Sequence, residues 1–315
     1  MKSSKEPCRA SYGELMQTTD KPVSHSSLKI WYLAARPRTL TAAVMPVMIG
    51  SALAYRDGFF DSTVALVALL CAFLLQIGSN FANDLFDFLS GADTRERKGP
   101  MRVVASGLVS PAQMKAALVI VFGLAFILGL YLITIGGWPI LVIGIASIIV
   151  AITYTGGPYP LGYYGWGDLM VFLFFGFIGT MGTYYVHSLQ LSITSFLLSI
   201  PVGALITNIL IINNYRDVDT DAKAGKRTTA VIFGKKFART EFAVFLFSAY
   251  GIPLIVWLFF DLSAWILLPF FSFPLGLRVL AMMNTLHGRE LNLALEQSAK
   301  LVALYGILFA IGISV

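Results

Sequence analysis

Two segments of this chain combine carboxylates and Asn in nearly the same order. The first reads Asn83-Asp84-Leu85-Phe86-Asp87 and is followed by Asp93. The second reads Asn213-Asn214-Tyr215-Arg216-Asp217 and is followed by Asp219 and Asp221. Each segment lies at the end of a long apolar stretch, where carboxylates are costly and indicate a functional site. Asn83 and Asn213 are 130 residues apart, so the repeat predicts a chain built from two related halves.

The spacing within each segment predicts a shared face for the oxygen-bearing side chains. Asn83 and Asp87 are four residues apart, as are Asp217 and Asp221, and residues at this spacing lie on one face of a helix. Carboxylate oxygens without His or Cys suit hard cations, above all Mg²⁺. The metal-binding residues predicted from the pattern are Asp84, Asp87, Asp93, Asp217 and Asp221.

Basic residues beside both segments predict an anionic ligand that contains phosphate. They are Arg97, Arg102, Lys226 and Arg227. Arg holds phosphate oxygens through paired donors, and Mg²⁺ together with these cations would offset the repulsion among the carboxylates. The competing interpretation is that all these charges are solvated loop residues that mark helix ends. The repetition of the pattern disfavours that interpretation for Asp87, Asp93, Asp217 and Asp221.

The composition predicts a membrane protein. The chain has 315 residues, of which 57% are hydrophobic and 13% are charged, whereas a soluble domain carries about 25% charge. Nine nearly charge-free runs are expected to cross a bilayer, at 40–55, 64–78, 114–135, 140–153, 169–185, 193–212, 242–260, 264–283 and 301–315. The sequence therefore predicts an all-α membrane protein, with about nine transmembrane helices in one bundle built from two related halves.

Charge asymmetry predicts the orientation. The first 28 residues are polar and lack a signal-peptide core, so we expect a mobile cytoplasmic tail at 1–28 and a single transmembrane domain at 29–315. With nine spans, Lys and Arg gather in the inside loops, which places both Asp segments on the cytoplasmic face. The net charge of +6 reflects this bias rather than nucleic-acid binding. The connections 90–111 and 217–236, each about 20 residues, are expected to cap the active site.

The motifs resemble those of the UbiA superfamily of intramembrane prenyltransferases. The first motif is Asn83-Asp84-x-x-Asp87-x5-Asp93 with Arg97-x-Gly99-Pro100-x-Arg102, and the second runs from Asn213 through Asp217 and Asp221 to Gly225-Lys226-x-Thr228. Ala151-Ile152-Thr153-Tyr154-Thr155 and Gly165-x-Gly167-Asp168 also fit. Within the superfamily, the spacing is similar to that of the branch that prenylates 1,4-dihydroxy-2-naphthoate in menaquinone biosynthesis. The similarity extends from about Trp31 to the C-terminus.

The resemblance implies a reaction and roles for particular residues. Mg²⁺ held by both Asp motifs would bind a polyprenyl diphosphate, and transfer of the prenyl group to 1,4-dihydroxy-2-naphthoate would release diphosphate and CO₂ and give a demethylmenaquinone. Asp87, Asp217, Asp168 and Tyr154 are the implied catalytic residues. The implied substrate-binding residues are Asn83, Arg97, Arg102, Asn213, Lys226, Arg227 and Arg36.

The acceptor side is less determined by the pattern. Tyr154 would shield an allylic cation with its ring or serve as an ordinary interfacial anchor. Asp168 would orient a phenolic hydroxyl or assist its deprotonation, or act only as a helix N-cap. Arg36 and Arg38 would meet the acceptor carboxylate or anchor the cytoplasmic face.

Other functions remain open from sequence alone. Rival acceptors are 4-hydroxybenzoate, homogentisate, haem and chlorophyllide. A transporter would share the paired halves, although transporter sites usually lie near the membrane midplane rather than at one face. A non-catalytic scaffold would not need two Asp motifs.

Overall fold

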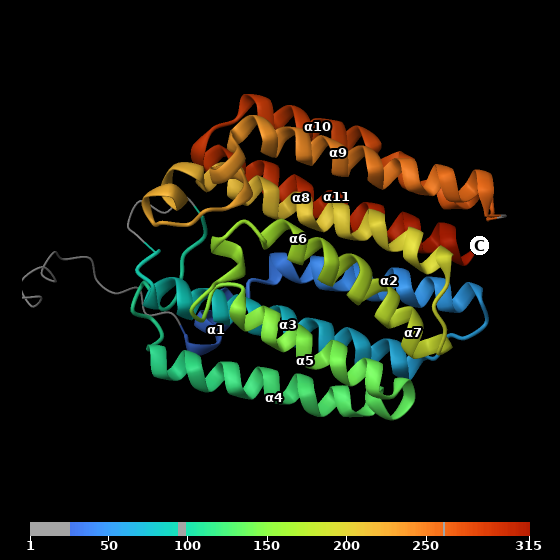
Figure 1. The fold of residues 1–315 in the computed structure, drawn as a ribbon, viewed down its shortest axis with the longest axis horizontal. Helices are drawn as coiled ribbons and strands as arrows, with labels where there is room; N and C mark the ends of the chain where they lie inside the picture. Colours follow the sequence, from blue (N-terminus) through green and yellow to red (C-terminus); the bar gives the residue numbers. More distant parts are fainter. Residues whose placement is uncertain (1–25, 94–98, 261) are drawn as a thin grey trace, which may run out of the picture.

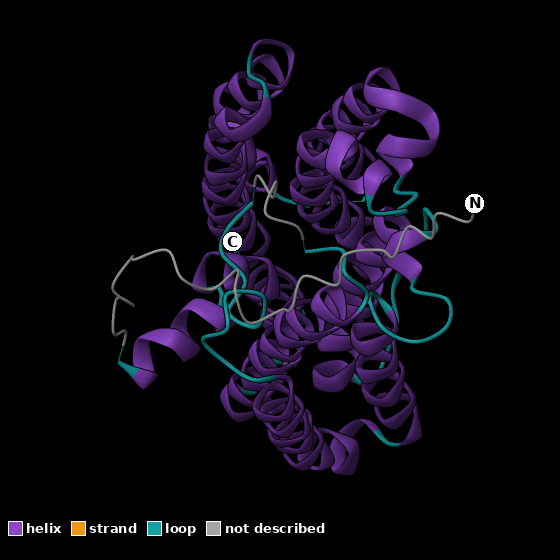
Figure 2. Ribbon diagram, turned by 90° about the vertical axis from the view of Figure 1, so that its left-hand side faces the viewer, coloured by secondary structure: helices purple, strands orange, loops and turns teal. Residues whose placement is uncertain are grey.

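A computed structural model describes residues 26–93, 99–260 and 262–315, and within these ranges the chain is helical and contains no strand (Figure 1). The elements in chain order are α1 (Ser27–Ala35), η2 (Pro37–Thr39), α2 (Leu40–Arg56), α3 (Ser62–Leu89), α4 (Pro111–Gly136), α5 (Trp138–Thr153), η3 (Leu161–Tyr163), α6 (Gly167–Val171), η4 (Phe172–Met181), α7 (Gly182–Ser188), α8 (Ile193–Lys223), α9 (Thr229–Phe259), η5 (Ala264–Ser272), α10 (Phe273–Thr285), η6 (Gly288–Glu290) and α11 (Leu291–Ser314). The long helices run side by side, and Figure 2 views the bundle nearly end-on. The expected tail at 1–28 falls almost entirely outside the described residues.

Most helices have the length and composition of membrane spans. Seven helical segments of the described chain are long and apolar enough to cross a bilayer. The expected count of nine is not confirmed, because the two other apolar runs form the shorter helices α2, with 17 residues, and α5, with 16. Large apolar side chains such as Val119 and Phe271 are exposed along the bundle, as expected for surfaces that face lipid. The chain is thus a multi-pass membrane protein.

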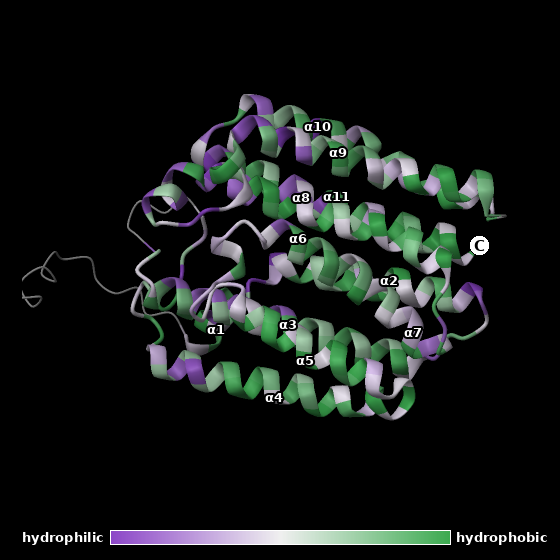
Figure 3. Ribbon diagram, in the orientation of Figure 1, coloured by the Kyte–Doolittle hydropathy of each residue, from purple (hydrophilic) through white to green (hydrophobic). Residues whose placement is uncertain are grey.

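Polar residues gather at the ends of the bundle. Figure 3 shows hydrophobic residues along the helices and hydrophilic ones concentrated where α3 ends and where α8 passes into α9. The two Asp motifs belong to these helix ends, because Asp87 lies in the last turn of α3 and Asp217 in the last turns of α8. Sequences 130 residues apart therefore meet at one end of the molecule.

Helix α8 is the central element that positions the second motif. It packs against α9, α11, α2 and the π-helical segment η4. Its apolar face includes the fully buried Leu205 and Ile212, and burial of each such side chain contributes about 1.5–3 kcal/mol. The second motif continues this buried helix without a break. The packing of α8 in the core therefore fixes the position and orientation of the turn that carries Asp217.

The predicted long loop at 217–236 is wrong. Helix α8 continues to Lys223, and α9 begins at Thr229 with Thr228 as its N-cap, so the connection is only 224–228. The stretch Asp217–Lys223 is charged but contains no Gly or Pro, and solvated charges are compatible with a helix that projects beyond the apolar layer. The helix ends where Gly225 adopts a φ of 75°, a conformation that favours glycine.

Candidate active site

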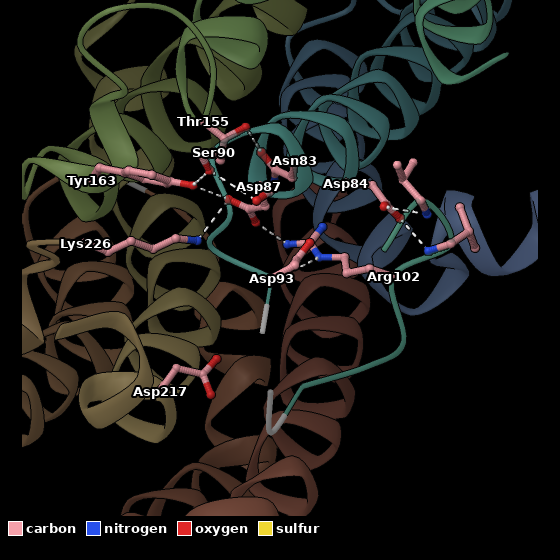
Figure 4. A network of polar contacts seen from close by, with 12 residues as sticks. Asn83, Asp84, Asp87, Ser90, Asp93, Arg102, Thr155, Tyr163, Asp217 and Lys226 are labelled. Atoms are coloured by element: carbon pink, nitrogen blue, oxygen red, sulfur yellow. Dashed lines mark hydrogen bonds and ion pairs between the residues drawn. The ribbon is translucent and has the colours of Figure 1, made fainter. Parts of the chain in front are cut away.

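Asp87 is the centre of the polar cluster at this end of the bundle. It is 2% exposed, and three side chains from separate parts of the chain bind its carboxylate (Figure 4). Arg102 Nη2 lies 2.6 Å from Oδ2, while the Tyr163 hydroxyl donates to Oδ1 at 2.6 Å and Lys226 Nζ donates to the same oxygen at 2.9 Å. The two cations neutralise a carboxylate that burial alone would destabilise. Asp87 therefore ties the loop after α3, the loop before α6 and the connection between α8 and α9 to one point.

Arg102 links two of the three acidic residues of the first motif, Asp87 and Asp93. Its Nε lies 3.7 Å from Asp93 Oδ1, in addition to the close contact with Asp87, and the guanidinium is 7% exposed. Two of its nitrogens, Nε and Nη1, are buried without a hydrogen-bond acceptor in the described structure. An Arg with unused donors in a buried position is suited to bind further anionic oxygens. The sequence assigned Arg102 to phosphate oxygens, and that role stays a prediction.

Asp84 faces a different set of partners from Asp87. Its Oδ2 accepts from the backbone N–H of Val103 at 3.0 Å and its Oδ1 accepts from that of Val104 at 3.1 Å. Val103 and Val104 are buried against the N-terminal helices, so this contact pins the loop that carries Arg102. The structure therefore shows Asp84 anchoring this loop, and its role as a metal ligand stays a prediction.

Tyr163 completes the surroundings of Asp87, and sequence reasoning missed it. Its ring lies under Lys226 Nζ, 4.5 Å from the centroid, and its backbone oxygen accepts from the N–H of Arg227 at 2.7 Å. Burial, followed by the charge of Asp87, raises the pKa of the Tyr163 hydroxyl well above its ordinary value. The phenol therefore stays protonated and donates to Asp87. No spacing signal links residues this far apart in the chain.

The second motif has its own internal ion pair. Arg216 holds Asp217 through two donors, with Nε 2.8 Å from Oδ1 and Nη2 2.5 Å from Oδ2, and its Nη1 donates to Asn292 at 2.6 Å. Figure 4 shows Asp217 on a different helix from Asp87, with no contact drawn between them. Asp217 and Asp221 do share one helix, as their spacing predicted.

Tyr154 lies at the end of α5, against the start of α6. Burial raises the pKa of its phenol above the ordinary value, and the charges of Asp168, Asp87 and Asp221 add to that effect. A Cβ atom on Gly167 would lie 2.8 Å from the Tyr154 hydroxyl oxygen, so the phenol rests against the start of α6. The structure thus brings Tyr154 to the same end of the bundle as both Asp motifs.

Asp168 is buried within α6 and connects three helices. Its Oδ1 accepts from Asn214 Nδ2 at 3.2 Å, and its Oδ2 accepts from the hydroxyl of Thr229. The N-cap of α6 is Trp166, so the interpretation of Asp168 as an N-cap is wrong. Instead, this carboxylate holds α6 against α8 and the first turn of α9.

The remaining predicted residues are placed less tightly. Asn83 Oδ1 accepts from the Thr155 hydroxyl at 3.0 Å, which joins α3 to the loop after α5. Asn213 is half-buried on α8, and the side chain of Arg227 is exposed. Arg36 adopts a left-handed conformation, with a φ of 50°, between α1 and η2. Arg97 lies outside the described residues.

The donor set fits Mg²⁺ in its chemistry. Asp87 and Asp93 from one motif and Asp217 and Asp221 from the other supply oxygen ligands only. No three His, Cys, Asp or Glu side chains within 26–93, 99–260 and 262–315 are grouped closely enough to hold a metal by themselves. That arrangement is compatible with Mg²⁺, which proteins usually bind through one or two carboxylates together with phosphate oxygens of a substrate.

The apolar bundle and its terminal cluster of buried acids and bases define an integral membrane protein with a charged site at one face. Comparison with known proteins gives the family. The chain belongs to the UbiA prenyltransferase family, whose model matches residues 43–295.

Relatives and solved structures agree with this assignment. A 1,4-dihydroxy-2-naphthoate octaprenyltransferase from Escherichia coli is 36% identical over 302 residues, which cover 94% of this chain and 97% of the relative. The protein of the same name from Haemophilus influenzae is 35% identical, with 93% and 98% covered. A UbiA homolog from Archaeoglobus fulgidus, solved with DMAPP and Mg²⁺ bound, has a TM-score of 0.63 at 15% identity, with 89% of this chain and 99% of that chain covered. At that identity, the likeness concerns the fold.

Proposed function

We propose that this protein transfers a polyprenyl group from polyprenyl diphosphate to 1,4-dihydroxy-2-naphthoate. The observation that carries the proposal is the buried Asp87 held by Arg102 and Lys226, with two donors of Arg102 left without an acceptor. Free guanidinium donors beside a lysine suit a ligand that carries several anionic oxygens. The names of the full-length relatives support the naphthoate acceptor.

On the donor side, the chain's own residues bind and orient the diphosphate. Arg102, Lys226 and Arg227 offer N–H donors to its oxygens, and Arg97 and Asn213 extend this set as predictions from the sequence. Asp87, Asp93, Asp217 and Asp221 would hold Mg²⁺, and Asp84 keeps the Arg102 loop in place. When bound, Mg²⁺ supplies positive charge that stabilises the departing diphosphate.

The transfer exchanges one bond for another at the prenyl C1. The C–O bond breaks with its electron pair on the diphosphate, and the ring carbon that bears the carboxylate forms the new C–C bond. Loss of CO₂ returns the electrons of the C–carboxyl bond to the ring, so the product is the reduced form of a demethylmenaquinone. Tyr154, which stays protonated, would offer its ring face to the positive C1, and Asp168 and Arg36 would orient the acceptor.

The protein is proposed to lie in the cell's inner membrane, with its active site on the cytoplasmic face. The Lys and Arg residues around both motifs support this orientation. A Cys placed in the 224–228 connection should react with an impermeant thiol reagent only in inverted vesicles, and labelling in intact cells would reverse the topology. Residues 29–315 would form a single prenyltransferase domain, with 1–28 as a cytoplasmic tail.

The decisive assay compares acceptors on one preparation. Purified protein with Mg²⁺ and a polyprenyl diphosphate should prenylate 1,4-dihydroxy-2-naphthoate and leave 4-hydroxybenzoate and homogentisate largely unreacted. Preference for either of the other acceptors would refute the naphthoate assignment while keeping the enzyme class. Absence of diphosphate release with every acceptor would refute prenyl transfer itself.

A further inference from the structure

Helix α9 carries a carboxyl group where a membrane helix should be apolar. Glu241 is the single charged residue in 240–260, and it lies in the regular part of the helix, after the break at Gly234. Its Oε2 is buried and has no hydrogen-bond partner in the described structure. An ionisable side chain within a membrane-spanning helix marks a functional site by default. Sequence reasoning missed Glu241 because it directly follows the charged stretch 235–239.

The packing places Glu241 opposite Asp168. Both α6 and α9 pack against α8, which lies between them in Figure 1. Phe172, the residue after α6, and Phe245 on α9 contact each other directly. Their rings are stacked, with centroids 5.4 Å apart and planes at 11°. The N–H of Phe172 donates to the Asp168 carbonyl, so Asp168 is one turn before Phe172, just as Glu241 is one turn before Phe245. The hydroxyl of Thr229, in the first turn of α9, donates to Asp168, so α6 and α9 start at the same end of the bundle. The two carboxyl groups therefore lie on the same side of the aromatic stack.

A buried amide oxygen on α8, which packs against α9, has no hydrogen-bond donor in the described structure. Asn208 on α8 is 1% exposed, and its Nδ2 donates to the carbonyl of Phe242 at 3.2 Å. Because that carbonyl only accepts, the amide orientation is fixed and Oδ1 must face elsewhere. Oδ1 is buried without a hydrogen-bond partner in the described structure. Unmet buried acceptors cost about 1–3 kcal/mol each, so a ligand that donates hydrogen bonds to Asn208 and Glu241 would recover part of that cost.

We propose that Glu241, Asp168 and Asn208 form the binding site for the hydroxyl groups of a hydroxylated aromatic acceptor, between α6, α8 and α9. A hydroxyl group donates a hydrogen bond, which is what the unpartnered oxygens of Glu241 and Asn208 lack. The stacked Phe172 and Phe245 supply an apolar floor for an aromatic ring. The inference rests on the proposed function, because it assigns the hydroxyls of that acceptor to named side chains.

The test measures binding separately from turnover. Equilibrium binding of 1,4-dihydroxy-2-naphthoate and of 2-naphthoate, which lacks both hydroxyls, is followed by fluorescence on purified wild type, Glu241→Leu and Glu241→Gln. Glu296→Gln is the matched control, because Glu296 lies on α11 and pairs with Lys300 at 3.1 Å. Thermal unfolding is recorded for each variant.

We expect Glu241→Leu to weaken binding of the dihydroxy compound by about 10- to 150-fold, the value of one hydrogen bond to a charged group, and to leave 2-naphthoate binding unchanged. Glu241→Gln should fall between, and Glu296→Gln should match wild type. Glu241→Leu should unfold at the same or a higher temperature, because it removes an unpartnered buried oxygen. An equal loss for both ligands, or no loss for either, overturns the inference.

Failure of the proposed function has a different signature. If wild type binds the dihydroxy compound more tightly than 2-naphthoate but does not prenylate it, the result supports the hydroxyl site and refutes the proposed reaction. A wild type that binds both compounds equally would overturn the hydroxyl site whatever its turnover. Destabilisation of Glu241→Leu together with unaltered ligand discrimination would assign Glu241 a structural role and also overturn the inference.

Discussion

Asp84 and Asp87 are three residues apart on one helix but have different partners in the structure, and replacing each by Asn should separate their roles. Both oxygens of Asp84 accept backbone N–H groups, at 3.0 and 3.1 Å, in a position that is 1% exposed. Asn keeps one oxygen and turns an NH₂ group toward the other N–H. One buried donor then loses a charged acceptor, which costs about 2–3 kcal/mol. We therefore expect Asp84→Asn to destabilise the loop that carries Arg102.

The assay is thermal unfolding of purified protein, with and without Mg²⁺ and diphosphate. A ligand at about 100 times its Kd stabilises the folded state by about 2.7 kcal/mol, which gives a measurable shift. Asp84→Asn should unfold at a lower temperature than wild type without ligand but keep most of the ligand-induced shift. Asp87→Asn should lose that shift, because it removes a carboxylate of the proposed metal and diphosphate site. If Asp84→Asn keeps its ligand-free stability and loses the shift, Asp84 is a metal ligand and the positioning role is wrong.

Three further predictions follow from the same contacts. Tyr163→Phe removes the 2.6 Å hydrogen bond to Asp87 but keeps the ring under Lys226. The value of kcat/KM for the prenyl diphosphate should therefore fall about 10- to 150-fold. An unchanged value would show that the hydroxyl has no role in function. Because its pKa is raised, the Tyr163 phenol should stay protonated at and above pH 10. The pH profiles of kcat/KM for wild type and Tyr163→Phe should therefore be parallel from pH 7 to about 10. A fall in kcat/KM over this range that only wild type shows would contradict this. Lys226→Met should raise KM for the prenyl diphosphate more than KM for the naphthoate, with the exposed Arg227→Met as a milder comparison, and the reverse order would swap the assigned roles.

The helical register of both motifs could be predicted from the sequence. A spacing of four residues fixes a common face whatever the tertiary structure, and Asp217 and Asp221 do lie on one helix, as do Asn83 and Asp87. The register does not say what the side chains meet. Asp84 is bound by backbone amides of a loop almost 20 residues later, and such a partner leaves no mark on side-chain spacing.

The parts that could not be predicted depend on tertiary contacts or on ambiguous local signals. The charged stretch after Asp217 was interpreted as a loop because it is polar, although it lacks a helix breaker before Gly225. Tyr163 reaches Asp87 through the packing of a short 3₁₀ turn, for which the sequence has no periodicity. Asp168 resembles an N-cap because it directly precedes the apolar run 169–185, but the helix begins before it.

The central claim is tested most directly by the stoichiometry of one turnover. Purified protein is incubated with a polyprenyl diphosphate and carboxyl-labelled 1,4-dihydroxy-2-naphthoate, and diphosphate, CO₂ and the prenylated naphthalenediol are quantified with Mg²⁺ and with EDTA. The account predicts equal amounts of the three products with Mg²⁺ and none with EDTA. Diphosphate released without CO₂, or product formed at an undiminished rate in EDTA, would contradict it.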